Sequence, residues 1–271
     1  MNLLCNRFRV PLNRAALMCQ LQHLIGVGYY YWHAGSVPAE KACRLLDKFV
    51  CLYPILATPS QRATSKKKGI ANVELLWGVD DSKPGYLRWF LLATKGKDRP
   101  GQTRYADSIH QLEPMKDARQ VPLLLGTHYQ LHQRLIEDRS EADRLRRKRG
   151  ARLRWTWSMT RGTFGGWQDQ VTQAAQSGDR YYQATFSHLI ASPMFAGIRT
   201  DLAALESVGR ATWKKNHTKA QFRPGLPHPL PFMPRIPVYG EMTLADLAEA
   251  ALKKVDTVKA EARAQALAAV H

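Results

Sequence analysis

The fold is decided by residues 28–53, GYYYWHAGSVPAEKACRLLDKFVCLY, because this stretch runs from a strand pattern directly into a helix pattern. The aromatic run at residues 29–33 has strong strand propensity. Ser36 and Pro38 then form a helix start, with a capping side chain followed by a ring that pre-sets the first turn. Apolar residues at helical spacing continue to about Tyr53, so we predict a strand followed by a helix.

Outward from this pair, the flanking patterns predict three more strands. Apolar and polar residues alternate over residues 72–77, while residues 87–93 are apolar on both sides apart from Arg88, as in a central strand. Another alternating strand is expected at residues 152–160. From residue 29 the order is strand, helix, strand, strand, helical segment and strand, which is the order of the ferredoxin-like fold. We therefore predict an α+β protein with a ferredoxin-like core.

The other segments are expected to extend this core. The second helix of an inserted basic finger is predicted at about residues 127–148, and later helices break near Gly178 and Ser192. A final helix opens at Thr243 and Asp246. Four regions are predicted: a core of residues 1–95 and 150–160, a basic helical finger at 96–149, a helical region at 161–222, and a Pro-rich arm with a C-terminal helix at 223–271.

Charge is the strongest property of the composition. The chain of 271 residues has 40 Lys and Arg against 22 Asp and Glu, so its formal net charge is +18. With 45% apolar residues the chain is too hydrophobic for a disordered protein, so this charge indicates a folded protein with a polyanionic partner. Nucleic acid is expected first, an anionic membrane second and an acidic protein third. The charge does not separate RNA from DNA.

Two clusters concentrate the positive charge. Residues 134–154 contain eight Arg and one Lys against four acidic residues, an excess that i,i+4 pairing on a solvated helix does not absorb. Arg grips phosphate groups with two parallel hydrogen bonds, so we expect these clusters to contact a nucleic-acid backbone. A solvated surface is the alternative, above all for the strand at 152–157. The predicted contact residues are Arg139, Arg144, Arg146, Arg147, Lys148, Arg149, Arg152, Arg154, Arg210, Lys214, Lys215, Lys219 and Arg223.

Motifs for metal and nucleotide chemistry are missing from the sequence. There is no G-x-x-x-x-G-K-[ST] loop and no paired acidic motif of a two-metal nuclease. His128 and His132 are four residues apart on the predicted finger helix, but no Glu follows His128 as in H-E-x-x-H, so we interpret them as a surface pair. We predict no metal and no cofactor.

The cysteines and the absence of long apolar runs bear on the compartment. None of the four cysteines, Cys5, Cys19, Cys43 and Cys51, has C-x-x-C spacing, so buried free thiols in a reducing compartment are expected. No run of about 18 apolar residues predicts a membrane span. The N-terminus has no signal-peptide pattern. We therefore expect a cytoplasmic protein without a membrane partner.

His33 has the best context for acid–base chemistry. It ends the predicted aromatic strand and precedes the helix cap, where helix N–H groups favour an anion. There it would exchange a proton with a ribose 2′-hydroxyl, while Tyr31 or an Arg stabilises the phosphorane. His23 and Arg9, near the first helix, are further catalytic candidates. A histidine bonded within the sheet is the alternative for His33.

Taken together, the aromatic first strand, the basic segment at about 103–150 and the strand that follows it resemble the CRISPR RNA-processing endoribonucleases. The chain is most similar to the type IV form, which has an α-helical finger, and the resemblance covers residues 29–160. It implies metal-independent cleavage of a stem-loop in precursor CRISPR RNA. It also implies that the protein stays bound to the hairpin with other subunits of a ribonucleoprotein complex. The alternatives are a plasmid or integrative-element replication protein that binds DNA, and a non-catalytic RNA-binding subunit.

Overall fold

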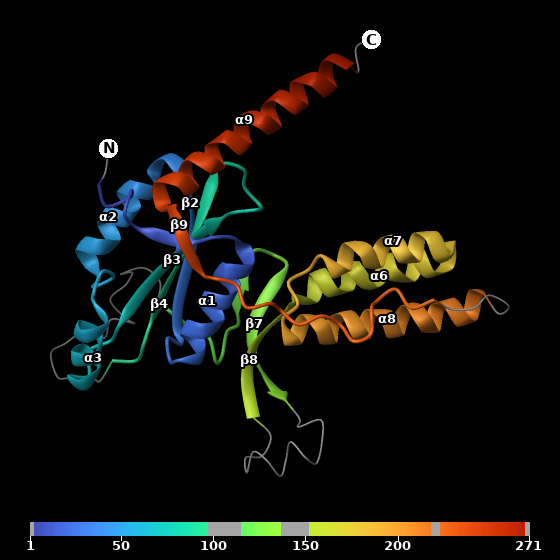
Figure 1. Ribbon diagram of the computed structural model, residues 1–271, viewed down its shortest axis with the longest axis horizontal. Coiled ribbons are helices and arrows are strands. Elements are labelled where there is room, and N and C mark those ends of the chain that lie inside the picture. Colours follow the sequence, from blue (N-terminus) through green and yellow to red (C-terminus); the bar gives the residue numbers. More distant parts are fainter. Residues whose placement is uncertain (1–2, 97–114, 137–151, 218–222, 269–271) are drawn as a thin grey trace. The chain divides into compact units, whose positions relative to one another are not determined.

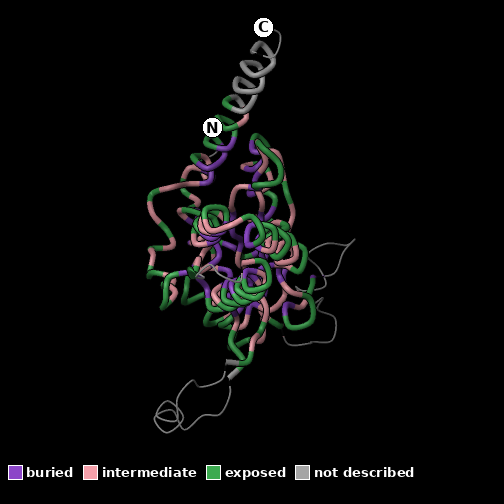
Figure 2. Tube along the Cα trace, turned by 90° about the vertical axis from the view of Figure 1, so that its right-hand side faces the viewer, coloured by how far each residue is buried: buried purple, intermediate pink, exposed green. Residues whose placement is uncertain are grey.

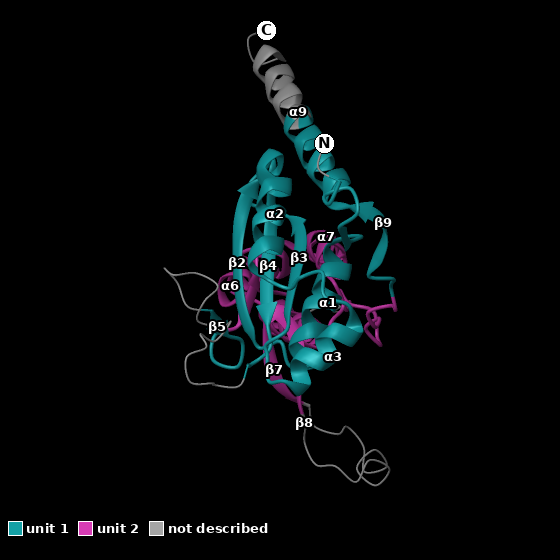
Figure 3. Ribbon diagram, turned by 90° about the vertical axis from the view of Figure 1, so that its left-hand side faces the viewer, with its two compact units in different colours: residues 1–121, 236–271 teal, residues 122–235 magenta. Residues whose placement is uncertain are grey.

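The computed structural model describes residues 3–96, 115–136, 152–217 and 223–268 (Figure 1). The chain divides into two compact units, residues 1–121 with 236–271 and residues 122–235, which Figure 3 shows in teal and magenta. Both units combine helices with antiparallel strands, so the predicted α+β class is confirmed. In the described part of the chain no helix is long and apolar enough to cross a membrane.

A four-stranded antiparallel sheet organises unit 1. Its strand order is β3-β4-β2-β5, with β4 paired on both sides as the predicted central strand. The pairing of β2 with β4 runs from Tyr31 opposite Ala93 to Pro38 opposite Tyr86. The strands are β2 (Tyr31–Pro38), β3 (Val73–Val79), β4 (Tyr86–Ala93) and β5 (Lys116–Asp117).

Helices cover both faces of this sheet. The face that contains Trp77 and Trp89 forms the main core with the short helix η1 (Ala39–Lys41), α2 (Ala42–Leu52) and the start of α9 (Leu244–Ala268). Gly78 faces the other way, and there Leu17 of α1 (Arg14–Gly26) fills the space that a Cβ would need. A further helix, α3 (Pro59–Lys67), begins with a capping box between Thr58 and Gln61.

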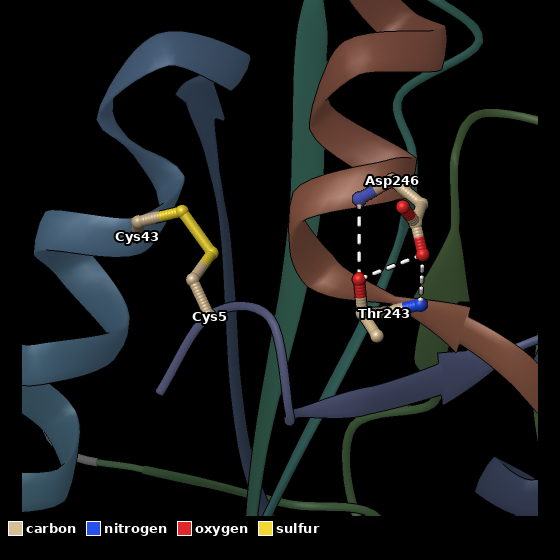
Figure 4. The surroundings of a disulfide bond; sticks show 4 residues. All are labelled: Cys5, Cys43, Thr243 and Asp246. Atoms are coloured by element: carbon tan, nitrogen blue, oxygen red, sulfur yellow. Dashed lines mark hydrogen bonds between the residues drawn. A yellow bond between two sulfur atoms is a disulfide. The ribbon is translucent and has the colours of Figure 1, made fainter. Parts of the chain in front are cut away.

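The N-terminal segment is tied to α2 by a disulfide bond between Cys5 and Cys43 (Figure 4). The prediction of free thiols is therefore wrong for these two cysteines, while Cys19 and Cys51 are free. Because of the turn before β1 (Arg9–Pro11), the Cα atoms of Cys5 and Cys43 lie 5.4 Å apart, although the two cysteines are 38 residues apart in the sequence. The spacing of the cysteines in the sequence does not predict this contact. Beside it, β1 pairs with β9 (Tyr239–Thr243).

The predicted start of the final helix is confirmed next to this disulfide. The side chain of Asp246 accepts hydrogen bonds from the backbone N–H and the hydroxyl of Thr243, at 2.9 and 2.7 Å. The backbone N–H of Asp246 in turn donates to the Thr243 hydroxyl at 3.3 Å (Figure 4). These bonds satisfy N–H groups at the helix start and hold the entry of α9 in place.

Within the described residues, unit 2 has a three-stranded antiparallel sheet and three helices that pack side by side (Figure 1). The predicted helix breaks near Gly178 and Ser192 are confirmed. The extended arm that follows is held on the last of these helices by Glu206, which accepts from the Leu226 backbone N–H at 3.0 Å. The elements are β6 (Leu123–Leu125), β7 (Tyr129–Ile136), β8 (Arg152–Met159), α6 (Arg161–Ser177), α7 (Asp179–Ile190) and α8 (Ala196–Asn216).

Two predictions about this unit are wrong. The segment from Tyr129 to Ile136 is a strand and not part of a finger helix, and β8 pairs with this strand rather than completing the sheet of unit 1. Leu131 and Leu135 are four apart and fit a helix, but Leu131 pairs with Trp157 in the sheet and is buried there. A ferredoxin-like core made of residues 1–95 and 150–160 is therefore not confirmed.

Candidate nucleic-acid interface

The polar face of the β7–β8 hairpin brings six side chains together in unit 2. Side chains of a strand alternate between its two faces, so residues at even positions of both strands share one face. Opposite this face, the hairpin carries Tyr129, Leu131 and Trp157, which are buried. The register pairs the polar residues as Gln130 with Ser158, His132 with Thr156, and Arg134 with Arg154.

One end of this face is buried under helix α8. Thr156 and Ser158 are 2% and 6% exposed. The backbone N–H of Gly197 in α8 donates to the Thr156 hydroxyl at 3.0 Å, and the backbone N–H of Met159 donates to the Asp201 carboxylate at 2.8 Å. The helix therefore lies directly against β8, and it places a carboxylate at the buried end of the polar face.

Burial decreases along the hairpin toward residues 136 and 152, as the change from purple to green in Figure 2 shows. His132 and Arg134 are half-buried and Arg154 is exposed. The polar face thus begins under α8 with hydroxyl groups and opens to solvent with two guanidinium groups.

His132 lies at the transition between the buried and the open end. Its Nδ1 atom is 3.2 Å from the Ser158 hydroxyl oxygen. Burial lowers the pKa of His132 below the ordinary value of 6.5, the carboxylate of Asp201 acts in the opposite direction, and Arg134 lowers it further. A lowered pKa favours the uncharged form of the His132 imidazole.

Asp201 interacts with the same groups from the helix side. Burial raises the pKa of its carboxyl group, while the hydrogen bond from Met159 and the charges of Arg134 and His132 lower it. The three ionisable side chains His132, Arg134 and Asp201 therefore influence one another's charge, and His132 is the one within hydrogen-bond distance of the Ser158 hydroxyl. Perturbed titratable groups that gather in one place are typical of functional sites.

At the open end, two cations face each other across the strands. Arg134 and Arg154 are direct cross-strand partners on the same face. Like charges in this position repel and destabilise a sheet, by up to about 1 kcal/mol relative to a neutral pair. An anion bound between them removes the repulsion, and two guanidinium groups side by side suit the oxygens of a phosphodiester.

A second basic cluster lies at the end of α8. Arg210, Lys214 and Lys215 are exposed on its last turns. Arg223 is 3.8 Å from the carboxylate of Asp179, and both side chains are so exposed that this ion pair contributes little to stability. Lys214 and Lys215 are exposed on the same turns, and the contact role predicted for this cluster stays a prediction.

The predicted catalytic residues are distributed over several elements of unit 1. Tyr31 and His33 share one face of β2, on the side covered by α2, and the His33 ring is 5.5 Å from the ring of Trp89. His23 is exposed in the last turn of α1. The Arg9 guanidinium donates to the carbonyl of Gly240 at 3.0 Å and lies at the β1–β9 pair. Tyr31 and His33 therefore lie on the same face of β2, whereas Arg9 lies in β1.

The predicted strand end at His33 is wrong. Strand β2 continues past His33 to Pro38, because each of these residues pairs with β4, and the following short helix begins at Ala39. His33 therefore lies within a paired strand beside Trp89 and not next to a helix N-terminus. The expected anion site of helix N–H groups is not formed at this residue.

Some of the predicted contact residues lie outside the described residues. Arg152 is the first residue of β8 and pairs with Ile136 in the register. Arg154, Arg210, Lys214, Lys215 and Arg223 are described above. The others fall in segments that the structure does not describe: Arg139, Arg144, Arg146, Arg147, Lys148, Arg149 and Lys219.

Sequence reasoning missed the cluster of His132, Ser158 and Asp201. The signal for it was the period of two over residues 129–135, in which apolar Tyr129 and Leu131 alternate with polar Gln130 and His132. As for metal ligands, no group of three or more His, Cys, Asp or Glu side chains is assembled among the residues with assigned structure. Comparison with family models, curated proteins and solved structures finds no match for the chain.

Proposed function

We propose that the chain is an RNA-binding endoribonuclease that holds a structured RNA on the polar face of the β7–β8 hairpin and cleaves it without a metal ion. The observation that carries this proposal is the like-charged pair Arg134–Arg154 next to the half-buried His132, whose ring lies 3.2 Å from the Ser158 hydroxyl. The cations bind a phosphodiester, and a neutral imidazole accepts a proton at physiological pH. Both are needed for cleavage by the 2′-hydroxyl of the RNA itself.

The sequence between the two strands supports this assignment. Residues 137–151, which connect β7 to β8, contain five Arg and one Lys against four acidic residues, so the connecting segment adds a net charge of +2. A two-stranded ribbon with basic side chains follows a nucleic-acid groove, and A-form RNA is read mostly through its backbone and shape. The exposed cations at the end of α8 provide a second backbone contact within unit 2.

The resemblance to CRISPR RNA-processing endoribonucleases defines the substrate of this proposal. The RNA is then the repeat stem-loop of a precursor CRISPR RNA, and the protein remains on the product hairpin with other subunits of a cytoplasmic ribonucleoprotein complex. Since a 2′-hydroxyl is the nucleophile, the products have a 2′,3′-cyclic phosphate and a 5′-hydroxyl.

Binding is tested with a stem-loop RNA and a duplex DNA of equal length, titrated with the full chain over a range of KCl concentrations in EDTA. The double variant Arg134→Ala/Arg154→Ala should lower the slope of log affinity against log salt by about 0.7–0.9, because both guanidinium groups hold the same phosphodiester. Lys253→Ala/Lys254→Ala removes the same charge from exposed positions of α9 and is the matched control.

The outcomes separate the three classes of protein. Cleavage of the RNA in EDTA supports the endoribonuclease, and binding without cleavage assigns the chain to the non-catalytic RNA-binding subunits. Binding of duplex DNA alone favours the replication protein. An unchanged salt slope in the Arg134→Ala/Arg154→Ala variant would show that the hairpin is not the interface.

A further inference from the structure

We infer that His132 is the base that removes the proton from the RNA 2′-hydroxyl, and that Arg134 and Arg154 hold the phosphodiester to be cut. This inference rests on the proposed function and assigns its reaction to one place in unit 2. Ser158 and Asp201 do not touch the RNA in this assignment, so they are positioning residues. The site is formed by β7, β8 and α8 of unit 2, whereas His33 belongs to β2 of unit 1.

The geometry at the buried end holds the imidazole in place. In the tautomer with a proton on Nδ1, the ring donates that proton to the Ser158 hydroxyl, 3.2 Å away. This leaves the lone pair on Nε2, the second ring nitrogen, available to accept a proton. Ser158 itself is 6% exposed and lies on a strand that α8 covers, so it is a rigid support for the ring.

The electrostatics of the surroundings set the protonation state. The groups that act on His132 are Ser158 from β8, Asp201 from α8, and Arg134 and the backbone carbonyl of Gln130 from its own strand, the last of which raises the pKa of His132. Burial and Arg134 keep the ring uncharged before the reaction, while the Asp201 carboxylate stabilises the imidazolium that forms during it. An orienting partner on Nδ1 and an acid nearby are typical of histidines that act as general bases.

The position along the hairpin brings the base and the phosphate ligands together. Positions 132 and 134 are two residues apart on one face of β7, about 6–7 Å along an extended strand. The phosphate and the ribose of one nucleotide are separated by a similar distance. An RNA phosphate bound by Arg134 and Arg154 therefore places its ribose beside the His132 ring. The half-buried His132 is the point at which the open basic face meets the buried hydroxyl groups.

The chemical step is a transesterification that balances without a co-reactant. The 2′-oxygen gives its proton to His132 Nε2 and forms a bond to the adjacent phosphorus. The bond from this phosphorus to the 5′-oxygen of the next nucleotide breaks, and that oxygen takes a proton from solvent water. His132 then returns its proton to solvent. The two guanidinium groups stabilise the additional negative charge that develops on the non-bridging oxygens.

The test compares histidine variants of the full chain in binding and in single-turnover cleavage of the stem-loop RNA, in EDTA. His132→Ala should bind RNA with unchanged affinity and cleave about 10²–10⁴-fold more slowly, the contribution of a positioned general base. His128→Ala is the matched control, because His128 is exposed at the start of the same hairpin. His33→Ala, measured in parallel, decides between the two candidate bases.

Further variants keep the test valid if His132→Ala fails to fold. His132→Gln retains a polar side chain of similar size and should show the same loss of cleavage. Ser158→Ala should lower the cleavage rate of bound RNA without changing the KM. In the unchanged chain the rate should rise with pH and level off below pH 6.5, because the pKa of His132 is lowered by burial. His132→Gln should remove this acid limb.

Each outcome bears on one of the two proposals. If the unchanged chain cleaves RNA and His132→Gln cleaves it equally fast, His132 is not the base, although the proposed function stands. A loss in His33→Ala without a loss in His132→Ala would also overturn the inference. If the unchanged chain neither binds nor cleaves the RNA, the proposed function fails, and the inference fails with it.

Discussion

Gly197→Ala is expected to destabilise the protein, because the glycine lets α8 lie against β8. A Cβ at Gly197 would be 3.0 Å from the carbonyl carbon of Trp157 and 3.1 Å from Cγ2 of Thr156, and it would lie closer still to the Trp157 carbonyl oxygen. The backbone of Trp157 is held by its pairing with Leu131, so no side-chain rotation relieves the overlap. The helix has to move away from the strand.

The magnitude follows from three contributions. Inserting a methyl group into a packed contact costs about 1–3 kcal/mol. Moving α8 also breaks the buried hydrogen bond from the Gly197 N–H to the Thr156 hydroxyl, which contributes about 1 kcal/mol. Alanine in place of glycine stabilises a helix by about 1 kcal/mol in the opposite direction. We therefore expect a net loss of about 1–3 kcal/mol in the free energy of unfolding.

Gly166→Ala is the control for this prediction. Gly166 lies on an exposed side of α6 in the same unit, and a Cβ there would have no heavy atom within 4 Å. This substitution changes helix propensity without a steric conflict, so it should stabilise the protein by about 0.5–1 kcal/mol. The two glycine variants thus have opposite expected signs.

The assay is urea unfolding followed by tryptophan fluorescence, since Trp157 is buried beside the substituted residue. The folded Gly197→Ala protein should also cleave RNA more slowly, because α8 positions Asp201 against His132. If Gly197→Ala is as stable as the unchanged chain, or is stabilised like Gly166→Ala, α8 does not pack against β8 as described. The site built on this contact would then be wrong as well.

Two further substitutions test an electrostatic contact and a covalent one. Asp201→Asn keeps an oxygen for the Met159 N–H but removes the charge that favours the His132 imidazolium, so the pKa of His132 should fall further in an NMR titration; a rise would contradict the described geometry. The pKa of Asp201 is higher in the folded protein than in the unfolded chain, so the proton on this carboxyl group favours the folded state. This stabilisation is complete below the pKa of the unfolded chain and is lost as the pH rises through the pKa of the folded protein. Asp201→Asn should remove this pH dependence of the free energy of unfolding. Cys43→Ser opens the loop of 38 residues closed by the disulfide with Cys5 and should lower the free energy of unfolding by about 4 kcal/mol in oxidising buffer; equal stability of both proteins there would show that the bond does not form.

Local sequence patterns predicted the elements whose periodicity is unambiguous. The aromatic run before Ser36, the alternation over residues 72–77 and the apolar run at 87–93 are strands in one sheet. The helix that opens at Thr243 also occurs as predicted, whereas the helix that ends near Tyr53 begins later than predicted, because Ser36 and Pro38 still belong to strand β2. At Thr243 the capping residues lie in the first turn of the helix, so short-range interactions determine where this helix starts.

Long-range contacts decided the elements that were predicted wrongly. The Cys5–Cys43 bond depends on how the N-terminal turn folds back on α2. The segment at β7 contains Leu131 and Leu135, whose spacing fits a helix, but the pairing of this segment with β8 buries Leu131 opposite Trp157. The four-residue spacing of Leu131 and Leu135 does not show that this segment pairs with a strand more than twenty residues further along the chain.

The candidate site was missed for the same reason. On a helix His132 shares a face with His128, and this pairing led to its interpretation as a surface residue. On a strand it shares a face with Gln130 and Arg134, so its neighbours change completely. Asp201 comes from α8 and reaches the site through a hydrogen bond to the β8 backbone, for which the sequence has no local signal.

The two ends of the polar face of the β7–β8 hairpin differ in burial and charge: one end has two solvent-accessible cations, and the other has buried polar groups. This contrast favours a functional role over a purely structural one. Stability alone does not require Arg134 and Arg154 to be direct cross-strand partners, because like charges oppose the pairing of strands, although the Asp201 carboxylate interacts with Arg134 from α8. If the face served only to attract a polyanion, the ring of His132 would not need the buried Ser158 hydroxyl on one side and the Asp201 carboxylate nearby, since burying polar groups is costly unless each is bonded. A base held at the margin of a phosphate-binding surface accounts for both ends at once: the open end brings the phosphodiester, and the buried end orients the group that acts on it.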